Sequence, residues 1–112
     1  MMYEQILQAV KRWFAGAQRD YAERVTFAVS ESLHGLNVNM ETERYLAQLN
    51  VSEPDFRPYR YAEFCVLDKK QEIDSPPAYL YQDKDGDTVS DVLAGLDAGI
   101  RLIGGGEVLY AN

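Results

Sequence analysis

The spacing of hydrophobic residues changes twice along this chain, and these changes constrain the fold more than any other feature. From Tyr3 to Tyr21, apolar residues recur every three or four positions, as on one face of an amphipathic helix. From about Arg24 to Gln82 they mostly alternate with polar residues, as in half-buried strands. The helical spacing returns from Val89 to Ile103. A helix at each end of a run of strands is typical of an α+β domain.

Turn residues divide the central region into five predicted strands. These are Arg24–Leu33, Leu36–Glu41, Tyr45–Val51, Tyr59–Asp68 and Ala78–Gln82. His34-Gly35 is predicted to form a hairpin turn, since glycine readily adopts positive φ. Leu46 interrupts the polar face of the third strand, which indicates that this face is partly covered. We expect residues 1–112 to form a single α+β domain, in which both helices pack on one face of an antiparallel meander.

The second helix has clear start and stop signals. Thr88 is predicted to be its N-cap, with Asp91 completing a capping box, and Gly104–Gly106 ends it. Glu107–Asn112 is expected to be a short edge strand or a frayed tail. Gly95 and Gly99 form small-residue pairs with Ala94 and Ala98. These pairs leave two interpretations open, namely close packing of the helix on the sheet or contact between helices across a homodimer.

Composition restricts the function. A hydrophobic content of 46% fits a folded protein, and a net charge of −7 argues against general binding of nucleic acid or of anionic membranes. The single cysteine provides no internal disulfide, the N-terminus lacks a signal-peptide pattern, and no apolar run approaches the roughly 20 residues of a membrane span. We therefore expect a cytoplasmic protein whose partner is a basic protein.

No catalytic or metal-binding pattern stands out. Cys65 and His34 are the only thiol and imidazole, and Cys65 is expected to be a small buried hydrophobic residue. Asp83, Asp85 and Asp87 alternate, but the glycine and glutamate of a calcium loop are not at the required positions. We therefore expect a protein without enzymatic activity, cofactor or metal.

The acidic residues and tyrosines form the candidate partner-binding site. Residues 71–112 carry eight acidic and two basic side chains, and tyrosines precede the acidic turn in two segments that could pair as a hairpin. Tyrosine offers a large contact area with a polar tip, which suits recognition surfaces. The alternative is that the tyrosines stabilise the sheet and that the acids start the helix. The candidate residues are Asp83, Asp85, Asp87, Asp91, Tyr79, Tyr81, Tyr59 and Tyr61.

The order of elements resembles the small acidic immunity proteins of bacterial polymorphic-toxin systems, and within them the helix–meander–helix type called TriTu. The similar features are the opening helix with Trp13-Phe14, the strands Tyr45–Val51 and Tyr59–Asp68, and the acidic step into a helix at Asp83–Ile103. The resemblance implies a protein that neutralises a cognate toxin by covering its active surface. Two other classes remain open: an acidic secretion chaperone or adaptor acting as a homodimer, and a small-ligand-binding domain.

Overall fold

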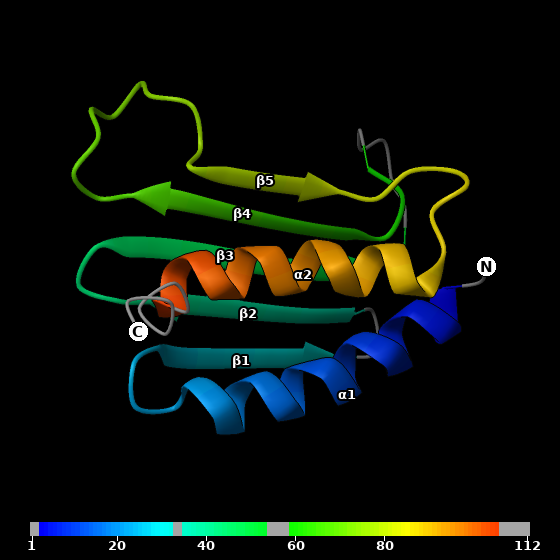
Figure 1. The fold of residues 1–112 in the computed structure, drawn as a ribbon. Coiled ribbons are helices and arrows are strands. Elements are labelled where there is room, and N and C mark those ends of the chain that lie inside the picture. Colours follow the sequence, from blue (N-terminus) through cyan, green and yellow to red (C-terminus); the bar gives the residue numbers. More distant parts are fainter. Residues whose placement is uncertain (1–2, 33–34, 54–58, 106–112) are drawn as a thin grey trace, which may run out of the picture.

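Two helices lie on one face of a five-stranded antiparallel sheet (Figure 1), as the hydrophobic spacing predicts. The computed structural model describes residues 3–32, 35–53 and 59–105. The predicted turn residue His34 and the predicted tail Glu107–Asn112 lie outside these residues. The elements are α1 (Tyr3–Tyr21), β1 (Thr26–Ser32), β2 (Gly35–Glu41), β3 (Tyr45–Ser52), β4 (Ala62–Asp68), β5 (Tyr79–Gln82) and α2 (Val89–Gly104).

The strands form a simple meander in the order β1-β2-β3-β4-β5, and each pairs antiparallel with the next. Because side chains alternate along a strand, each row of paired residues points to one face of the sheet. Val38 pairs with Leu49, and Leu49 with Phe64; all three are fully buried beneath the helices. The neighbouring rows point to the opposite face.

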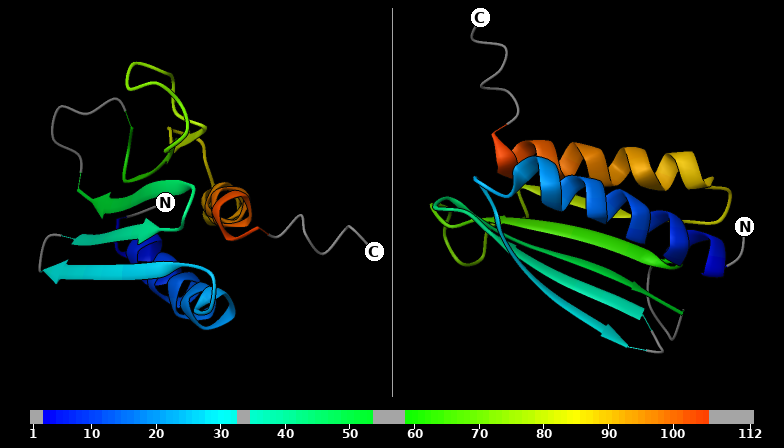
Figure 2. Two further views of the ribbon diagram at one scale, coloured as in Figure 1. Left: turned by 90° about the vertical axis from the view of Figure 1, so that its left-hand side faces the viewer. Right: turned by 90° about the horizontal axis from the view of Figure 1, so that it is seen from below.

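The core lies between the helices and the sheet. Ile6, Val10 and Phe14 of α1 are buried there together with Leu96 and Ile100 of α2. The helices contact each other, and Trp13 Nε1 donates a hydrogen bond of 2.7 Å to Asp97 Oδ1. Both helices lie on the same side of the sheet in the perpendicular views (Figure 2).

The ends of α2 follow the local sequence signals. The Thr88 hydroxyl accepts a hydrogen bond from the Asp91 backbone N–H, and the Asp91 carboxylate accepts one from the Thr88 backbone N–H. Gly105 caps the other end at a φ of 71°, where a side chain would be strained. The predicted capping box is confirmed.

Gly95 and Gly99 of α2 face the sheet. A Cβ atom added at Gly95 would meet the ring of Tyr81, and one added at Gly99 would meet the rings of Phe64 and Tyr79. Close packing of the helix on the sheet is therefore the interpretation that the structure confirms. These two glycines are covered by the protein's own strands, so they do not offer a surface to a second copy.

Candidate protein-binding surface

Asp83 was expected to be exposed, and this is wrong. Its side chain is fully buried directly after β5, where Oδ1 accepts hydrogen bonds from the backbone N–H groups of Arg60, Tyr61 and Ala62 at 3.0, 2.7 and 2.9 Å. Oδ2 is also buried, with no hydrogen-bond partner among the described residues. Asp83 therefore holds the chain that leads into β4 and cannot contact a partner.

Asp85 and Asp87 lie between this anchor and α2, and Asp91 lies in the first turn of α2. Asp85 is fully exposed, with Oδ1 3.7 Å from Arg60 Nε. Asp87 is partly buried and accepts a hydrogen bond of 2.8 Å from the Tyr81 hydroxyl. Asp91 is exposed and is engaged in the capping box. Asp87 and Asp91 thus hold the turn and the start of α2 in place, and of these three acids Asp85 is the one whose carboxylate is fully exposed to a partner.

Tyr79 and Tyr81 are partly buried beneath α2. The Tyr79 hydroxyl donates a hydrogen bond of 2.5 Å to the Gly95 carbonyl, and its ring contacts Phe64 edge-on. Burial raises the pKa of Tyr79, and burial together with the neighbouring Asp87 raises the pKa of Tyr81 further. Both hydroxyls therefore remain protonated donors, and the two side chains join the sheet to α2.

Tyr59 and Tyr61 lie before β4 rather than inside it, so the predicted start of this strand is wrong. The backbone N–H groups of Arg60 and Tyr61 donate to Asp83 Oδ1 instead of to a residue of a neighbouring strand, and β4 begins only at Ala62. Tyr61 is half-buried between the ring of Tyr3, at 5.7 Å between centroids, and the Arg60 guanidinium, at 4.8 Å. Tyr59 is also half-buried. The eight candidate residues therefore do not form one exposed surface.

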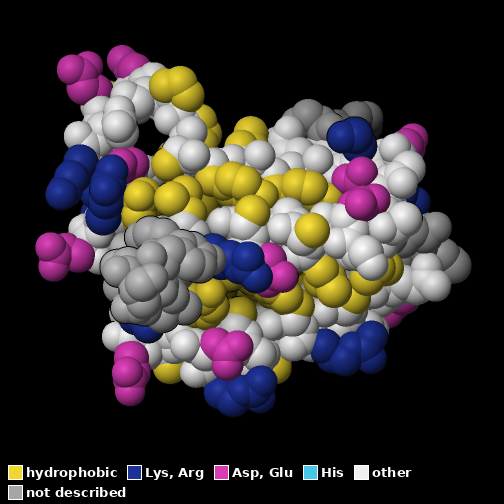
Figure 3. Space-filling model, in the orientation of Figure 1, with side chains coloured by type: hydrophobic (Ala, Val, Ile, Leu, Met, Phe, Trp, Pro, Cys, Tyr) yellow, Lys and Arg dark blue, Asp and Glu magenta, His cyan; other side chains and the backbone are white. Residues whose placement is uncertain are grey.

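The helix-bearing side shows no single acidic field. Acidic and basic side chains are interspersed over this side, at its centre as well as around its rim (Figure 3). Some of its charges are paired: Lys11 of α1 bonds to Glu31 of β1, and within α1 Arg19 Nε lies 3.7 Å from Asp20 Oδ1. A basic partner would therefore find isolated acids on this side rather than a continuous acidic patch.

The opposite face of the sheet carries the strongest surface feature. We call it the open face; it consists of the strand residues that point away from the helices. Leu46, Leu67 and Leu80 lie there with 44%, 47% and 48% of their surface exposed. Leu46 pairs with Leu67, and the next row pairs Cys65 with Leu80. The three strands thus bring four apolar side chains into one cluster.

Amide side chains cover the rest of the open face. Asn37 donates to Asn50, Asn50 to Gln48 at 3.1 Å, and Gln48 to Asn39 at 3.2 Å. Gln82 donates to Glu63 at 2.6 Å. None of the five described strands contains a lysine or arginine. The face is therefore apolar at one corner, amide-rich elsewhere, and charged only at Glu41 and Glu63.

A groove of about 330 Å³ runs across this face. Thr26, Ala28, Leu46, Gln48, Cys65 and Leu67 are among the residues that line it. Cys65 is partly exposed here, so its expected burial is wrong. Burial raises the pKa of its thiol, as does the neighbouring carboxylate of Glu63. The cysteine therefore contributes a neutral, apolar side chain to the groove.

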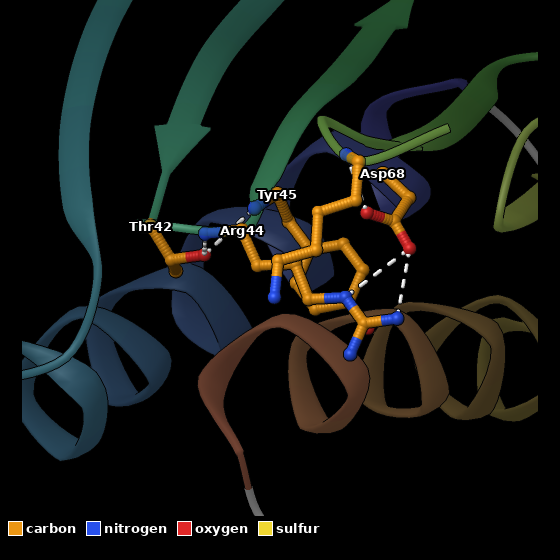
Figure 4. A network of polar contacts seen from close by, with 5 residues as sticks. Thr42, Arg44, Tyr45 and Asp68 are labelled. Atoms are coloured by element: carbon orange, nitrogen blue, oxygen red, sulfur yellow. Dashed lines mark hydrogen bonds and ion pairs between the residues drawn. The ribbon is translucent and has the colours of Figure 1, made fainter. Parts of the chain in front are cut away.

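A polar network fixes the end of the sheet next to the leucines (Figure 4). Arg44 donates through Nε and Nη2 to Asp68 Oδ2 at 3.1 and 2.9 Å. Asp68 Oδ1 accepts from the Lys70 backbone N–H at 2.9 Å, and the Thr42 hydroxyl accepts from the backbone N–H groups of Arg44 and Tyr45. The network joins the β2–β3 turn to the end of β4, which holds Leu46 and Leu67 side by side.

This network predicts a loss of stability in acid. The hydrogen bond from Arg44 is the main cause that lowers the pKa of Asp68, and the hydrogen bond from the Lys70 backbone N–H is the second. Outside this network, the hydrogen bond from the Thr88 backbone N–H lowers the pKa of Asp91. A lowered folded-state pKa stabilises the fold above the ordinary aspartate value of about 3.9, and this contribution is lost as the pH falls through the lowered value. Urea unfolding from pH 6 to pH 2 should show a smaller decline for Asp68→Asn than for the wild type. Asp74→Asn, an exposed acid of the following loop, is the control, and a decline as steep in Asp68→Asn as in the wild type would contradict the prediction.

The sequence contains one signal for the open face. Leu46 was interpreted as a sign of cover on the polar side of β3, and it lies on the open face. No second layer covers that face in the described structure. Leu67 and Leu80 carry no comparable signal, because only the strand register brings them next to Leu46.

Other kinds of site find no support among the described residues. They contain no group of three or more histidine, cysteine, aspartate or glutamate side chains that could hold a metal ion. Neither described helix is long and apolar enough to cross a membrane. No protein-family model, curated protein or solved structure matches the chain.

Proposed function

We propose that this chain is a non-catalytic protein-binding protein of the inhibitor type, and that it holds its partner against the open face. The observation that carries the proposal is the cluster of Leu46, Leu67 and Leu80, each nearly half exposed on an uncovered sheet. Contiguous exposed apolar patches on small proteins are most often interaction sites, because burying them in a complex removes them from water.

The surface suits a protein partner better than a reaction. The apolar corner supports burial, and the amides beside it, such as Gln48 and Asn50, can both donate and accept hydrogen bonds. Among the residues that line the groove, the carboxylate of Glu41 is paired with Lys69 and the thiol of Cys65 has a raised pKa, so neither is set up as a general base or a nucleophile. Binding alone is therefore the activity that these side chains support best.

The charge of the protein favours a basic partner. The chain has a net charge of −7, and the strand positions of the open face include Glu41 and Glu63 but no basic residue. A partner with an apolar patch bordered by lysine or arginine would complement this face and would associate faster at low salt. In the form implied by the resemblance to immunity proteins, the partner is a cognate bacterial toxin, and the complex forms in the cytoplasm.

A capture experiment tests this proposal. Tagged protein is mixed at low salt with lysate and secreted fractions of the native host, and retained proteins are identified and quantified. Leu67→Asp should reduce the retention of a stoichiometric partner by at least about tenfold, because it places a charge in the centre of the contact. Ser90→Asp adds the same charge at an exposed position of α2 and should leave retention unchanged.

Equal retention by Leu67→Asp and the wild type would show that the partner binds elsewhere. Thermal melting of both variants establishes that they are folded before retention is compared. Asp85→Asn provides a further comparison, since Asp85 is the fully exposed acid of the original candidate set. Loss of retention in Asp85→Asn alone would move the contact to the acidic turn.

A further inference from the structure

The two edges of the sheet differ in how well they are protected. β5, at one edge, has only four residues and follows a loop that contains Pro76 and Pro77. Short edge strands and nearby prolines are common features that prevent a sheet from pairing with another chain. β1, at the other edge, has seven residues, of which six are exposed. It contains no proline, lysine or arginine.

The edge of β1 is accessible along its length. β1 pairs with β2 from Thr26 to Ser32, and no other strand of residues 3–32, 35–53 and 59–105 pairs with it. α1 contacts its helix-side face only in part, where Phe14 packs against Phe27 and Lys11 bonds to Glu31. Seen from the β1 side, the strand lies at the front of the sheet and clear of most of α1 (Figure 2, right). Backbone N–H and C=O groups of alternate residues between Thr26 and Glu31 therefore point outward, with no described strand beside them.

We infer that two copies of this chain pair through β1, antiparallel about a twofold axis at Val29, to form one continuous sheet of ten strands. This arrangement would pair the outward backbone groups of each copy with those of the other. Isologous contact about a twofold axis is the commonest way in which identical chains associate. The inference concerns the edge of the sheet and does not depend on the function proposed for the open face.

The side chains of β1 suit a second copy of the same strand. Val29 is 47% exposed on the helix side, and it would pack against its own copy. Glu31, the only charged residue of β1, would lie opposite Phe27 rather than opposite another glutamate, and it is already bonded to Lys11. On the other face, the small residues Ala28 and Ser30 would lie opposite each other. No like charges meet at the edge, although the chain as a whole is acidic.

The pairing would leave the open faces of both copies free. Residues opposite each other in an antiparallel pair point to the same face, so both helix layers would lie on one side and both open faces on the other. The dimer would therefore present two copies of the leucine cluster in the same direction. A contact made by one pair of strands buries less than the roughly 1,200 Å² of a standard interface, so we expect a weak dimer.

Sedimentation equilibrium between about 10 μM and 1 mM tests the inference, since this range covers weak association. The wild type should shift with concentration from the monomer mass of 12.7 kDa towards twice that value. Val29→Lys should remain a monomer, because a lysine on an edge strand opposes strand pairing. Residue 29 would lie opposite its own copy at the axis, so the two lysines would also repel each other there.

Leu80→Lys is the matched control, because Leu80 is as exposed as Val29 and lies on the open face. It should dimerise like the wild type. A monomeric wild type at 1 mM, or a dimer that Leu80→Lys abolishes, would overturn the inference. Hydrogen exchange of the wild type provides a readout without substitution: amides of β1 should become more protected as concentration rises. Unchanged β1 protection in a sample that dimerises would also overturn it.

Discussion

Asp83→Ala should destabilise the protein by about 3–5 kcal/mol, the largest effect that we expect from removing one polar side chain. The carboxylate is fully buried, and one of its oxygens accepts three backbone hydrogen bonds. Alanine would leave the N–H groups of Tyr61 and Ala62 without this acceptor, and that of Ala62 is buried. The free energy of unfolding of a small domain is only about 5–15 kcal/mol, so the variant should be close to unfolding at ambient temperature.

The position of Asp83 explains why so much depends on it. Its backbone also takes part, since Asp83 N–H donates to the Ala62 carbonyl at 3.1 Å and the Asp83 carbonyl accepts from Arg60 at 2.9 Å. Side chain and backbone together join the end of β5 to the start of β4. A substitution here would therefore loosen both strands as well as the turn into α2.

Urea unfolding followed by circular dichroism measures the effect. Asp85→Ala is the control. It removes the same charge two residues further along the chain, where the side chain is fully exposed, and it should change stability by no more than about 1 kcal/mol. Asp83→Asn should lie between the two, since its amide oxygen can still accept from residues 60–62. An unfolding free energy for Asp83→Ala within about 1 kcal/mol of the wild type would contradict the role given to this carboxylate.

The secondary structure was predictable because its signals are local. The apolar spacing of α1 and α2 and the alternation in β2 and β3 each depend on neighbouring residues, and so does the capping box of Thr88 and Asp91. The register of β1, β2 and β3 follows from the short connections between these strands. These are the features for which a single sequence carries sufficient information.

The candidate site was harder to predict because it depends on contacts between distant residues. Asp83 was expected at the surface, as most acids are, but its role comes from N–H groups more than 20 residues earlier in the chain. Tyr79 and Tyr81 were left with two interpretations, and packing against α2 decides for the structural one. Leu46, Leu67 and Leu80 are separated in sequence, and only the pairing of β3, β4 and β5 brings them together.

Gly99→Ala and Gly16→Ala should change stability in opposite directions, although both replace a glycine inside a helix. A Cβ atom added at Gly99 would lie 2.7 Å from Cε2 of Phe64, whose ring is fully buried and cannot move aside. Overpacking of this kind destabilises a protein by about 1–3 kcal/mol. This outweighs the gain of about 1 kcal/mol that alanine usually brings over glycine inside a helix. At Gly16, the nearest atom to the added Cβ is the end of the flexible Arg19 side chain at 3.7 Å.

Gly16→Ala should therefore stabilise the protein by about 0.5–1 kcal/mol, and Gly99→Ala should destabilise it. Thermal and urea unfolding of both variants measure the difference, which we expect to be about 2 kcal/mol. Phe64→Leu tests the cause, because a smaller side chain beneath α2 makes room for the added methyl group. In a double-mutant cycle, the cost of Gly99→Ala should be smaller in the Phe64→Leu background. An equal cost in both backgrounds would mean that the distance between α2 and β4 is not set by contact of the helix backbone with this ring.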